Sequence, residues 1–129
     1  MNLYRFISSA FANLFVVVGF AQSTSNGFES LPYADFATFA SDTAHYQILD
    51  VRRPDEFSLG HIPHAVNINV LDSSFERLCQ SLLSSGKGVA VYCRSGRRSK
   101  VAAEKLVRMG FAVKELDGGF LSWEGQVVK

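Results

Sequence analysis

The sequence predicts an α/β domain with a central, mostly parallel sheet of about five strands, flanked by helices on both faces. Two observations carry this prediction. From Phe28 onward, short apolar runs alternate with helical patterns over roughly 100 residues. One run, residues 88–92, is continuously apolar, which is typical of a central parallel strand covered on both faces. The chain of 129 residues is long enough for one such domain and too short for two.

Strands are expected where short apolar or alternating runs occur. Residues 65–70 alternate apolar and polar positions, as a half-buried strand does, and residues 28–31 add an edge strand. The expected strands are 28–31, 47–51, 65–70, 88–92 and 112–116.

Helical patterns fill the gaps between these strands. Segment 73–83 is amphipathic, and segment 54–59 begins with a proline, which is tolerated at the first position of a helix. Gly110 follows the last helical pattern and is expected in a left-handed conformation. The expected helices are 32–40, 54–59, 73–83 and 99–109.

The N-terminal segment differs from the rest of the chain. Residues 6–21 carry no charge and are rich in Phe, Leu, Val and Ala. Residues 19–21, Gly-Phe-Ala, supply small side chains two positions apart, as a signal-peptidase site requires. The polar residues 22–27 that follow suit a flexible linker. We therefore expect residues 1–21 to be a cleaved signal peptide.

Two consequences follow for domain organisation and location. Residues 28–129 form the single domain, and the protein is exported, to the periplasm or out of the cell. The alternative is a membrane anchor formed by residues 6–21, although a membrane span needs about 20 residues. A membrane is a partner only if this segment stays uncleaved. The net charge of +1 argues against nucleic acid as a partner, because nucleic-acid binding needs a strongly basic face.

Cys93 stands where the expected central strand ends and a helix is about to begin. Gly96 permits a backbone turn that other residues resist. Backbone N–H groups of such a loop can form a nest for an anion, and the following helix adds the positive end of its dipole. Arg94, Arg97 and Arg98 add positive charge with no acidic residue among them. Together these features favour a stabilised, nucleophilic thiolate over a buried structural cysteine.

The second cysteine, Cys79, falls on the apolar face of a helical pattern and is expected to be a buried, inert thiol. The alternative in an exported protein is a Cys79–Cys93 disulfide.

Four segments of the chain carry recognisable motifs. They are Asp50-Val51-Arg52, Gly60-His61-Ile62-Pro63-His64-Ala65-Val66-Asn67, Cys93-Arg94-Ser95-Gly96-Arg97-Arg98-Ser99 and Leu116-Asp117-Gly118-Gly119-Phe120-Leu121-Ser122-Trp123. In this order they resemble the motifs of the rhodanese family of single-domain sulfurtransferases, over almost the whole of residues 28–124. One departure is His64, which stands in a turn where the family usually has glycine.

The resemblance implies a rhodanese-like fold and a persulfide mechanism, with Cys93 as the catalytic nucleophile. The sulfur donor would be a small anion such as thiosulfate and the acceptor a thiol or cyanide, with neither a metal nor an organic cofactor required. The resemblance assigns substrate binding to Arg94, Ser95, Gly96, Arg97 and Arg98, and support of the loop to Asp50, Arg52 and Ser99.

The sequence leaves more than one role open for several residues and for the whole protein. Asp50 and Arg52 either brace the Cys93 loop through its backbone or form a local salt bridge. For His61, a hydrogen bond to nearby backbone is favoured over a general-base role. The alternatives for the whole protein are a noncatalytic rhodanese-like binding module and a cysteine-dependent phosphatase or arsenate reductase. The phosphatase class uses a longer loop than the four residues that separate Cys93 from Arg98 here.

Overall fold

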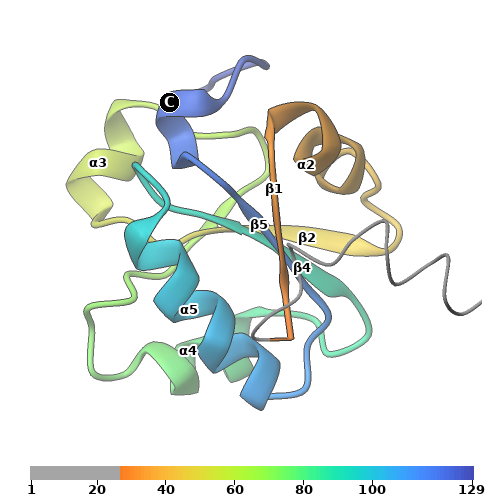
Figure 1. The fold of residues 1–129 in the computed structure, drawn as a ribbon. Helices are drawn as coiled ribbons and strands as arrows, with labels where there is room; N and C mark the ends of the chain where they lie inside the picture. Colours follow the sequence, from red (N-terminus) through yellow and green to blue (C-terminus); the bar gives the residue numbers. More distant parts are fainter. Residues whose placement is uncertain (1–26) are drawn as a thin grey trace, which may run out of the picture.

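The computed structural model describes residues 27–129, which fold around one sheet (Figure 1). The expected signal peptide, and residues 22–26 of the expected linker, lie outside the described residues. Within residues 27–129, no helix is both long and apolar enough to cross a bilayer.

The sheet has five strands in the order β1-β5-β4-β2-β3, and all neighbouring strands are parallel. This confirms the predicted α/β class. β4, the continuously apolar run of the sequence, occupies the centre, as predicted. The strands are β1 (Glu29–Leu31), β2 (Tyr46–Asp50), β3 (Val66–Asn67), β4 (Gly88–Tyr92) and β5 (Val113–Leu116).

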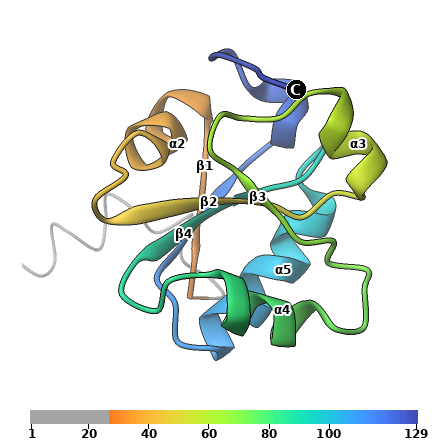
Figure 2. The ribbon, with the colours of Figure 1, turned by 180° about the vertical axis from the view of Figure 1, so that it is seen from behind.

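Helices cover both faces of this sheet, as predicted. Figures 1 and 2 show α4 and α5 together on one side and α2 on the other. The short helix α3 begins with Pro54 at its first position and buries none of its residues. The helices of the described part are α2 (Tyr33–Ala40), α3 (Pro54–Leu59), α4 (Phe75–Leu82), α5 (Arg97–Arg108) and the 3₁₀-helix η2 (Gly119–Ser122).

The alternation of side chains along β4 decides which face carries the cysteine. Successive side chains of a strand point to opposite faces of the sheet. Val89 and Val91 pack into the core with α4 and α5, whereas Ala90 and Tyr92 pack into the core with α2. Cys93 continues the first set, and it therefore lies on the α5 face.

Most elements begin or end one or two residues from the expected bounds, and two elements differ in ways that affect the site. The strand expected over 65–70 is only two residues long, although Ile68 and Val70 still donate backbone hydrogen bonds to β2 and the residue after it. Helix α5 begins at Arg97 rather than Ser99, because Gly96, with a φ of 100°, completes the turn two residues earlier. Arg97 and Arg98 consequently belong to the first turn of the helix.

Left-handed backbone occurs at Gly110, as predicted, and at His64, for which the sequence analysis noted only a departure from the family motif. Gly110 has a φ of 100°, and the next residue, Phe111, donates a backbone hydrogen bond to Leu106, which ends α5 as expected. His64 has a φ of 72°. Since glycine adopts this conformation without steric cost, the backbone explains why the resembling motif has glycine there.

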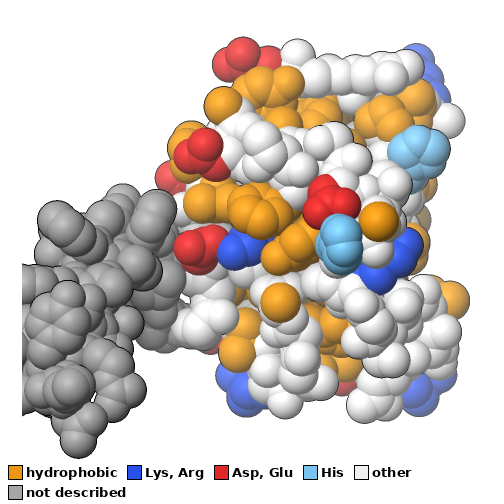
Figure 3. Space-filling model, turned by 90° about the vertical axis from the view of Figure 1, so that its right-hand side faces the viewer, with side chains coloured by type: hydrophobic (Ala, Val, Ile, Leu, Met, Phe, Trp, Pro, Cys, Tyr) orange, Lys and Arg blue, Asp and Glu red, His pale blue; other side chains and the backbone are white. Residues whose placement is uncertain are grey.

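The C-terminal segment is fixed beside α3. His61 and Val128 exchange two backbone hydrogen bonds in an isolated bridge. The face on the α2 side, away from α3, intersperses hydrophobic, acidic and basic side chains, and no single charge dominates it (Figure 3).

Candidate active site

Cys93 follows β4 directly and sits beneath the loop that leads into α5. In the parallel sheets of α/β proteins, ligand sites form outside the carboxyl ends of the strands, and Cys93 lies at such an end. The N–H of Gly96 points back and donates to Cys93 Sγ at 3.1 Å. The left-handed conformation of Gly96 makes this return possible. The sulfur is therefore held by a backbone donor of its own loop.

The first turn of α5 adds positive potential at the same place. The N–H groups of a first turn have no partner within their helix and form the positive end of the dipole. No acidic residue lies in this turn, and Arg97 is exposed there. The loop residues Arg94 and Ser95 are exposed as well. The arrangement can hold a small anion, or the outer sulfur of a persulfide, above Cys93.

A small cavity opens beside this loop, with a volume of about 180 Å³. Arg94 lines it from the loop, and Phe120 and Leu121 line it from η2. Cys93 itself is only 1% exposed and does not line this cavity, which lies beside the sulfur. The remaining lining residues are Arg52, Glu56, Leu59 and Gly60.

The turn after β5 supports the loop from behind. The backbone N–H of Phe120 donates to the Cys93 carbonyl at 2.7 Å, and that of Leu121 donates to the Arg94 carbonyl at 3.1 Å. A Cβ added to Gly119 would lie 2.5 Å from the Arg94 carbonyl carbon and oxygen. The sequence marks the two glycines here only as a tight turn, and their role in holding the loop depends on this tertiary contact.

Arg98 is engaged by α3. Its guanidinium donates to both carboxylate oxygens of Glu56, at 2.8 and 3.0 Å. Glu56 also accepts a hydrogen bond from the Arg53 N–H. The hydrogen bonds from Arg98 are the main reason why the pKa of Glu56 falls to about 2. The family resemblance assigns Arg98 to substrate binding, and nothing in the sequence singles out Glu56, because the two residues are 42 positions apart.

Asp50 and Arg52 form a buried ion pair at the end of β2. The guanidinium donates to Asp50 at 2.7 Å and to the Gly60 carbonyl, also at 2.7 Å. It also lies over the ring of Phe120, 4.5 Å from the centroid. The pair thus links β2 to the turn after α3 and to one wall of the cavity. The hydrogen bonds of the ion pair join it to these neighbours, so its support of the Cys93 loop is indirect.

Ser99 lies in the first turn of α5, next to the sulfur of Cys93. Its hydroxyl is 3.3 Å from Cys93 Sγ and 2.5 Å from a carboxylate oxygen of Glu115. Glu115 was not predicted as a site residue. The sequence does contain a signal for its burial, because Glu115 lies two residues after Val113 in β5 and therefore points to the same face of the sheet as this buried side chain.

Both cysteines of the described part are free thiols. Cys79 lies in α4 with no exposed surface, and burial raises its pKa to about 12. It is therefore protonated and unreactive at neutral pH, as an inert core cysteine should be. His61 hydrogen-bonds the Phe57 carbonyl at 3.0 Å and stacks on the Phe57 ring.

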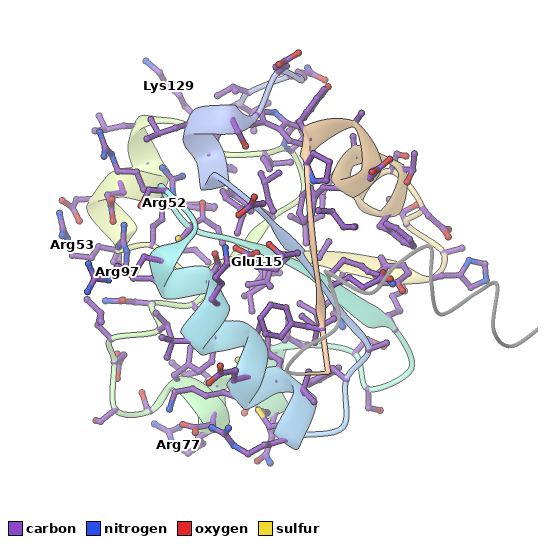
Figure 4. All side chains as sticks on the ribbon, in the orientation of Figure 1. Arg52, Arg53, Arg77, Arg97, Glu115 and Lys129 are labelled. Atoms are coloured by element: carbon purple, nitrogen blue, oxygen red, sulfur yellow. The ribbon has the colours of Figure 1, made fainter. Side chains whose placement is uncertain are left out.

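The labelled arginines show where positive charge gathers (Figure 4). Arg52, Arg53 and Arg97 lie on the side of the domain that carries α3 and the start of α5. Arg77 lies away from them near α4, and Glu115 lies inside the domain beside α5. Within residues 27–129, no group of three or more His, Cys, Asp or Glu side chains is arranged to hold a metal ion.

Comparisons with known proteins point to one family. Residues 35–126 match the rhodanese-like domain family. The chain is 37% identical over 90 residues to senescence-associated protein DIN1 of Raphanus sativus, covering 62% of this chain and 49% of that protein. It is 37% identical over 90 residues to thiosulfate sulfurtransferase 18 of Arabidopsis thaliana, with 60% and 66% covered. The chain spans about half the length of the radish protein and of an Arabidopsis chloroplastic rhodanese-like protein.

Solved structures share the same fold. A rhodanese-related protein from Thermoplasma volcanium superposes with a TM-score of 0.66 at 33% identity, covering 78% of this chain and 98% of that one. A protein of Rhodopseudomonas palustris described as a possible tyrosine phosphatase superposes with a TM-score of 0.62 at 28% identity, covering 78% and 82%.

Proposed function

Because the chain belongs to the rhodanese-like family, we propose that it is a sulfurtransferase that carries sulfur as a persulfide on Cys93. One observation carries the proposal. The sulfur of Cys93 lies at the carboxyl end of the central strand and accepts a backbone hydrogen bond from Gly96, at the positive end of α5. A thiolate in this position is stabilised by hydrogen bonding and by the helix dipole.

In the loading step, the Cys93 thiolate attacks the outer sulfur of a donor such as thiosulfate. A new bond forms between Sγ and this sulfur, while the donor's sulfur–sulfur bond breaks and its electron pair leaves with sulfite. The product is a persulfide anion on Cys93. Backbone N–H groups of residues 94–98 then stabilise the outer sulfur, as an oxyanion hole stabilises charge.

In the discharge step, an acceptor nucleophile attacks the outer sulfur of the persulfide. The bond between the two sulfurs breaks, and its electron pair returns to Cys93 as a thiolate. Cyanide would leave as thiocyanate, and an acceptor thiol would leave as a persulfide. The hydrogen bond from Gly96 that stabilises the attacking thiolate also stabilises it as a leaving group.

The cavity favours a small anionic donor. Its volume of about 180 Å³ leaves room for a group of a few atoms, and the exposed Arg94 contributes positive charge to its wall. The other charged lining residues, Arg52 and Glu56, are paired with Asp50 and Arg98. The exposed Arg97 extends this charge along the rim. Attraction between a dianionic donor and these cations raises the rate of encounter.

Intact mass measurement tests the proposal. After incubation with thiosulfate and removal of the donor, we expect the protein to gain the mass of one sulfur atom. Cys93→Ser abolishes this gain. Cys79→Ala is the matched control, and it retains the gain because the Cys79 thiol is protonated in the core.

Other outcomes identify the competing functions. A wild-type protein that gains no sulfur and instead hydrolyses an aryl phosphate would be a phosphatase. Against that reading, only four residues separate Cys93 from Arg98, fewer than that class uses, and the Arg98 guanidinium is bound by both carboxylate oxygens of Glu56. A folded wild-type protein with neither activity would be a binding module.

We propose further that the protein is exported, on the basis of the uncharged segment 6–21 and the small residues at 19–21. N-terminal sequencing of the protein recovered from its source should begin at Gln22. Recovery of the intact N-terminus in the membrane fraction would favour the anchor, and recovery in the cytoplasm would reject export.

A further inference from the structure

We propose that Glu115 is a positioning residue that takes up the proton of Cys93 through the hydroxyl of Ser99. The inference rests on the proposed function, in which Cys93 reacts as a thiolate. It is carried by an unbroken hydrogen-bonded path from the sulfur to a buried carboxylate on a neighbouring strand. Cys93, Ser99 and Glu115 are each at most 1% exposed, so water does not compete along this path.

The direction of the path follows from the number of protons available. Ser99 Oγ lies 2.5 Å from Glu115 Oε2 and 3.3 Å from Cys93 Sγ. A hydroxyl has one proton, and a carboxylate can only accept. Ser99 therefore donates to Glu115 and accepts from the Cys93 thiol. Every proton on the path points toward Glu115.

Glu115 is held in place independently of Cys93. Its other oxygen, Oε1, accepts a hydrogen bond from Ser30 in β1 at 2.5 Å and lies 3.3 Å from Lys100 Nζ. Burying an unpaired carboxylate would cost much of the free energy of folding, and hydrogen bonds and ion pairs with these partners offset that cost. These contacts hold one carboxylate oxygen, and the other oxygen, Oε2, faces the Ser99 hydroxyl.

Proton transfer along this path produces the nucleophile. The Cys93 S–H bond breaks, its electron pair stays on sulfur, and the proton passes to Ser99 Oγ. In the same step the Ser99 hydroxyl proton passes to Glu115 Oε2. The result is a thiolate, an intact hydroxyl and a neutral carboxyl group, with no net change in charge.

Charged groups around the path favour the state in which Cys93 is a thiolate and Glu115 is neutral. The hydrogen bonds to Glu56 raise the pKa of Arg98 most, and attraction to the charge on Cys93 raises it further; the same attraction stabilises the thiolate. Neutralising Glu115 also removes a negative charge that would otherwise stand near the thiolate. Lys100 keeps a carboxylate partner, because it lies 3.1 Å from Asp117 as well. The other charged groups near the path are Glu56 and Asp50, which act on Arg98, and Asp117, which acts on Lys100; Asp50 is itself paired with Arg52.

The test measures the rate at which iodoacetamide alkylates Cys93 as a function of pH, read by peptide mass mapping. Ser99→Ala interrupts the path, and Glu115→Gln removes the proton acceptor. We expect both variants to react about tenfold or more slowly below pH 7, with the rate rising to its plateau at higher pH than in the wild type. Ser99→Thr restores the hydroxyl and should restore the wild-type profile.

Ser41→Ala is the control, because its exposed hydroxyl bonds the Thr38 carbonyl in α2 and lies outside the path, and it should keep the wild-type profile. If Glu115→Gln does not fold, Ser99→Ala still tests the proposal, because this variant keeps the buried Glu115 and its partner Lys100. An unchanged profile in folded Ser99→Ala, or faster alkylation at low pH in Glu115→Gln, would overturn the proposal. The latter is what a purely electrostatic neighbour of Cys93 would give. Alkylation uses no sulfur donor, so a failure of the proposed sulfur transfer would appear separately, as absence of the mass gain from thiosulfate.

Discussion

At the scale of single residues, the active loop depends on a glycine outside it. Gly119 has a φ of 65°, and its missing side chain lets the turn after β5 lie against the Arg94 carbonyl. This contact allows the hydrogen bond from the Phe120 N–H to the Cys93 carbonyl. The position of Cys93 is therefore set from two sides, by its own loop and by this turn.

Gly119→Ala tests this dependence, with Gly110→Ala as its control. Both glycines are left-handed, so alanine costs about 1–2 kcal/mol of stability at either position. Only at Gly119 does the new Cβ meet backbone, at 2.5 Å, whereas at Gly110 nothing lies within 4 Å. We expect Gly119→Ala to lose more stability in urea unfolding and to lose sulfur loading. Equal sulfur loading in the two variants would show that the contact does not position the loop.

The sequence predicts residues of this site unevenly. Cys93 and Gly96 are predictable because the loop, its glycine and the following helix are contiguous in sequence. The left-handed His64 can be noticed in the sequence only because the family motif usually has glycine there. The buried Glu115 can be noticed only because it is a charged residue at a position of β5 that points to the same face as the buried Val113. The role of Gly119 depends on packing against residues far away in the chain, and local propensity carries no information on that packing.

At the scale of elements, α3 is fastened to α5 by a bidentate ion pair. Glu56 and Arg98 are 16% and 23% exposed at their side chains, so water screens the pair only partly. The sequence predicts both helices, with α3 at its observed bounds. It does not predict their contact, because charge pairing across a fold leaves no periodic pattern in the chain.

Glu56→Gln should lower the free energy of unfolding by about 2 kcal/mol at neutral pH, as loss of a charged hydrogen-bonded pair does. The pKa of Glu56 is about 2 in the folded protein, against an ordinary value of 4.5. A lowered pKa gives stability that is fully present above pH 4.5 and is lost as the pH falls toward 2. Urea unfolding of both proteins across this range should show their difference shrinking with acidity. A difference that stays constant would mean that the pair does not stabilise the fold.

At the scale of the whole molecule, positive charge is distributed unevenly over a chain with a net charge of only +1. Exposed arginines gather where the sheet ends under the Cys93 loop, and Figure 4 shows Arg77 well away from them. The predicted class, the parallel sheet of five strands and the cover of helices on both faces are confirmed. They were predictable because hydrophobic periodicity reports burial directly.

Removing the loop charges should slow donor capture. We expect a variant carrying Arg94→Gln and Arg97→Gln to load sulfur from thiosulfate about three- to tenfold more slowly at low ionic strength, and to approach the wild-type rate in high salt. Arg77→Gln, at the other end of the domain, should load as the wild type does. The rate of mass gain at several salt concentrations measures this, and equal rates in all three proteins would exclude electrostatic steering.

The central claim is that Cys93 carries sulfur between two separate reactions, and discharge of the isolated persulfide tests it most directly. The protein is loaded with thiosulfate, freed of donor and then exposed to cyanide, while thiocyanate and intact mass are measured together. We predict one thiocyanate for each loaded Cys93 and return of the original mass. A sulfur adduct that persists in cyanide, or thiocyanate that forms only while donor is present, would contradict the account.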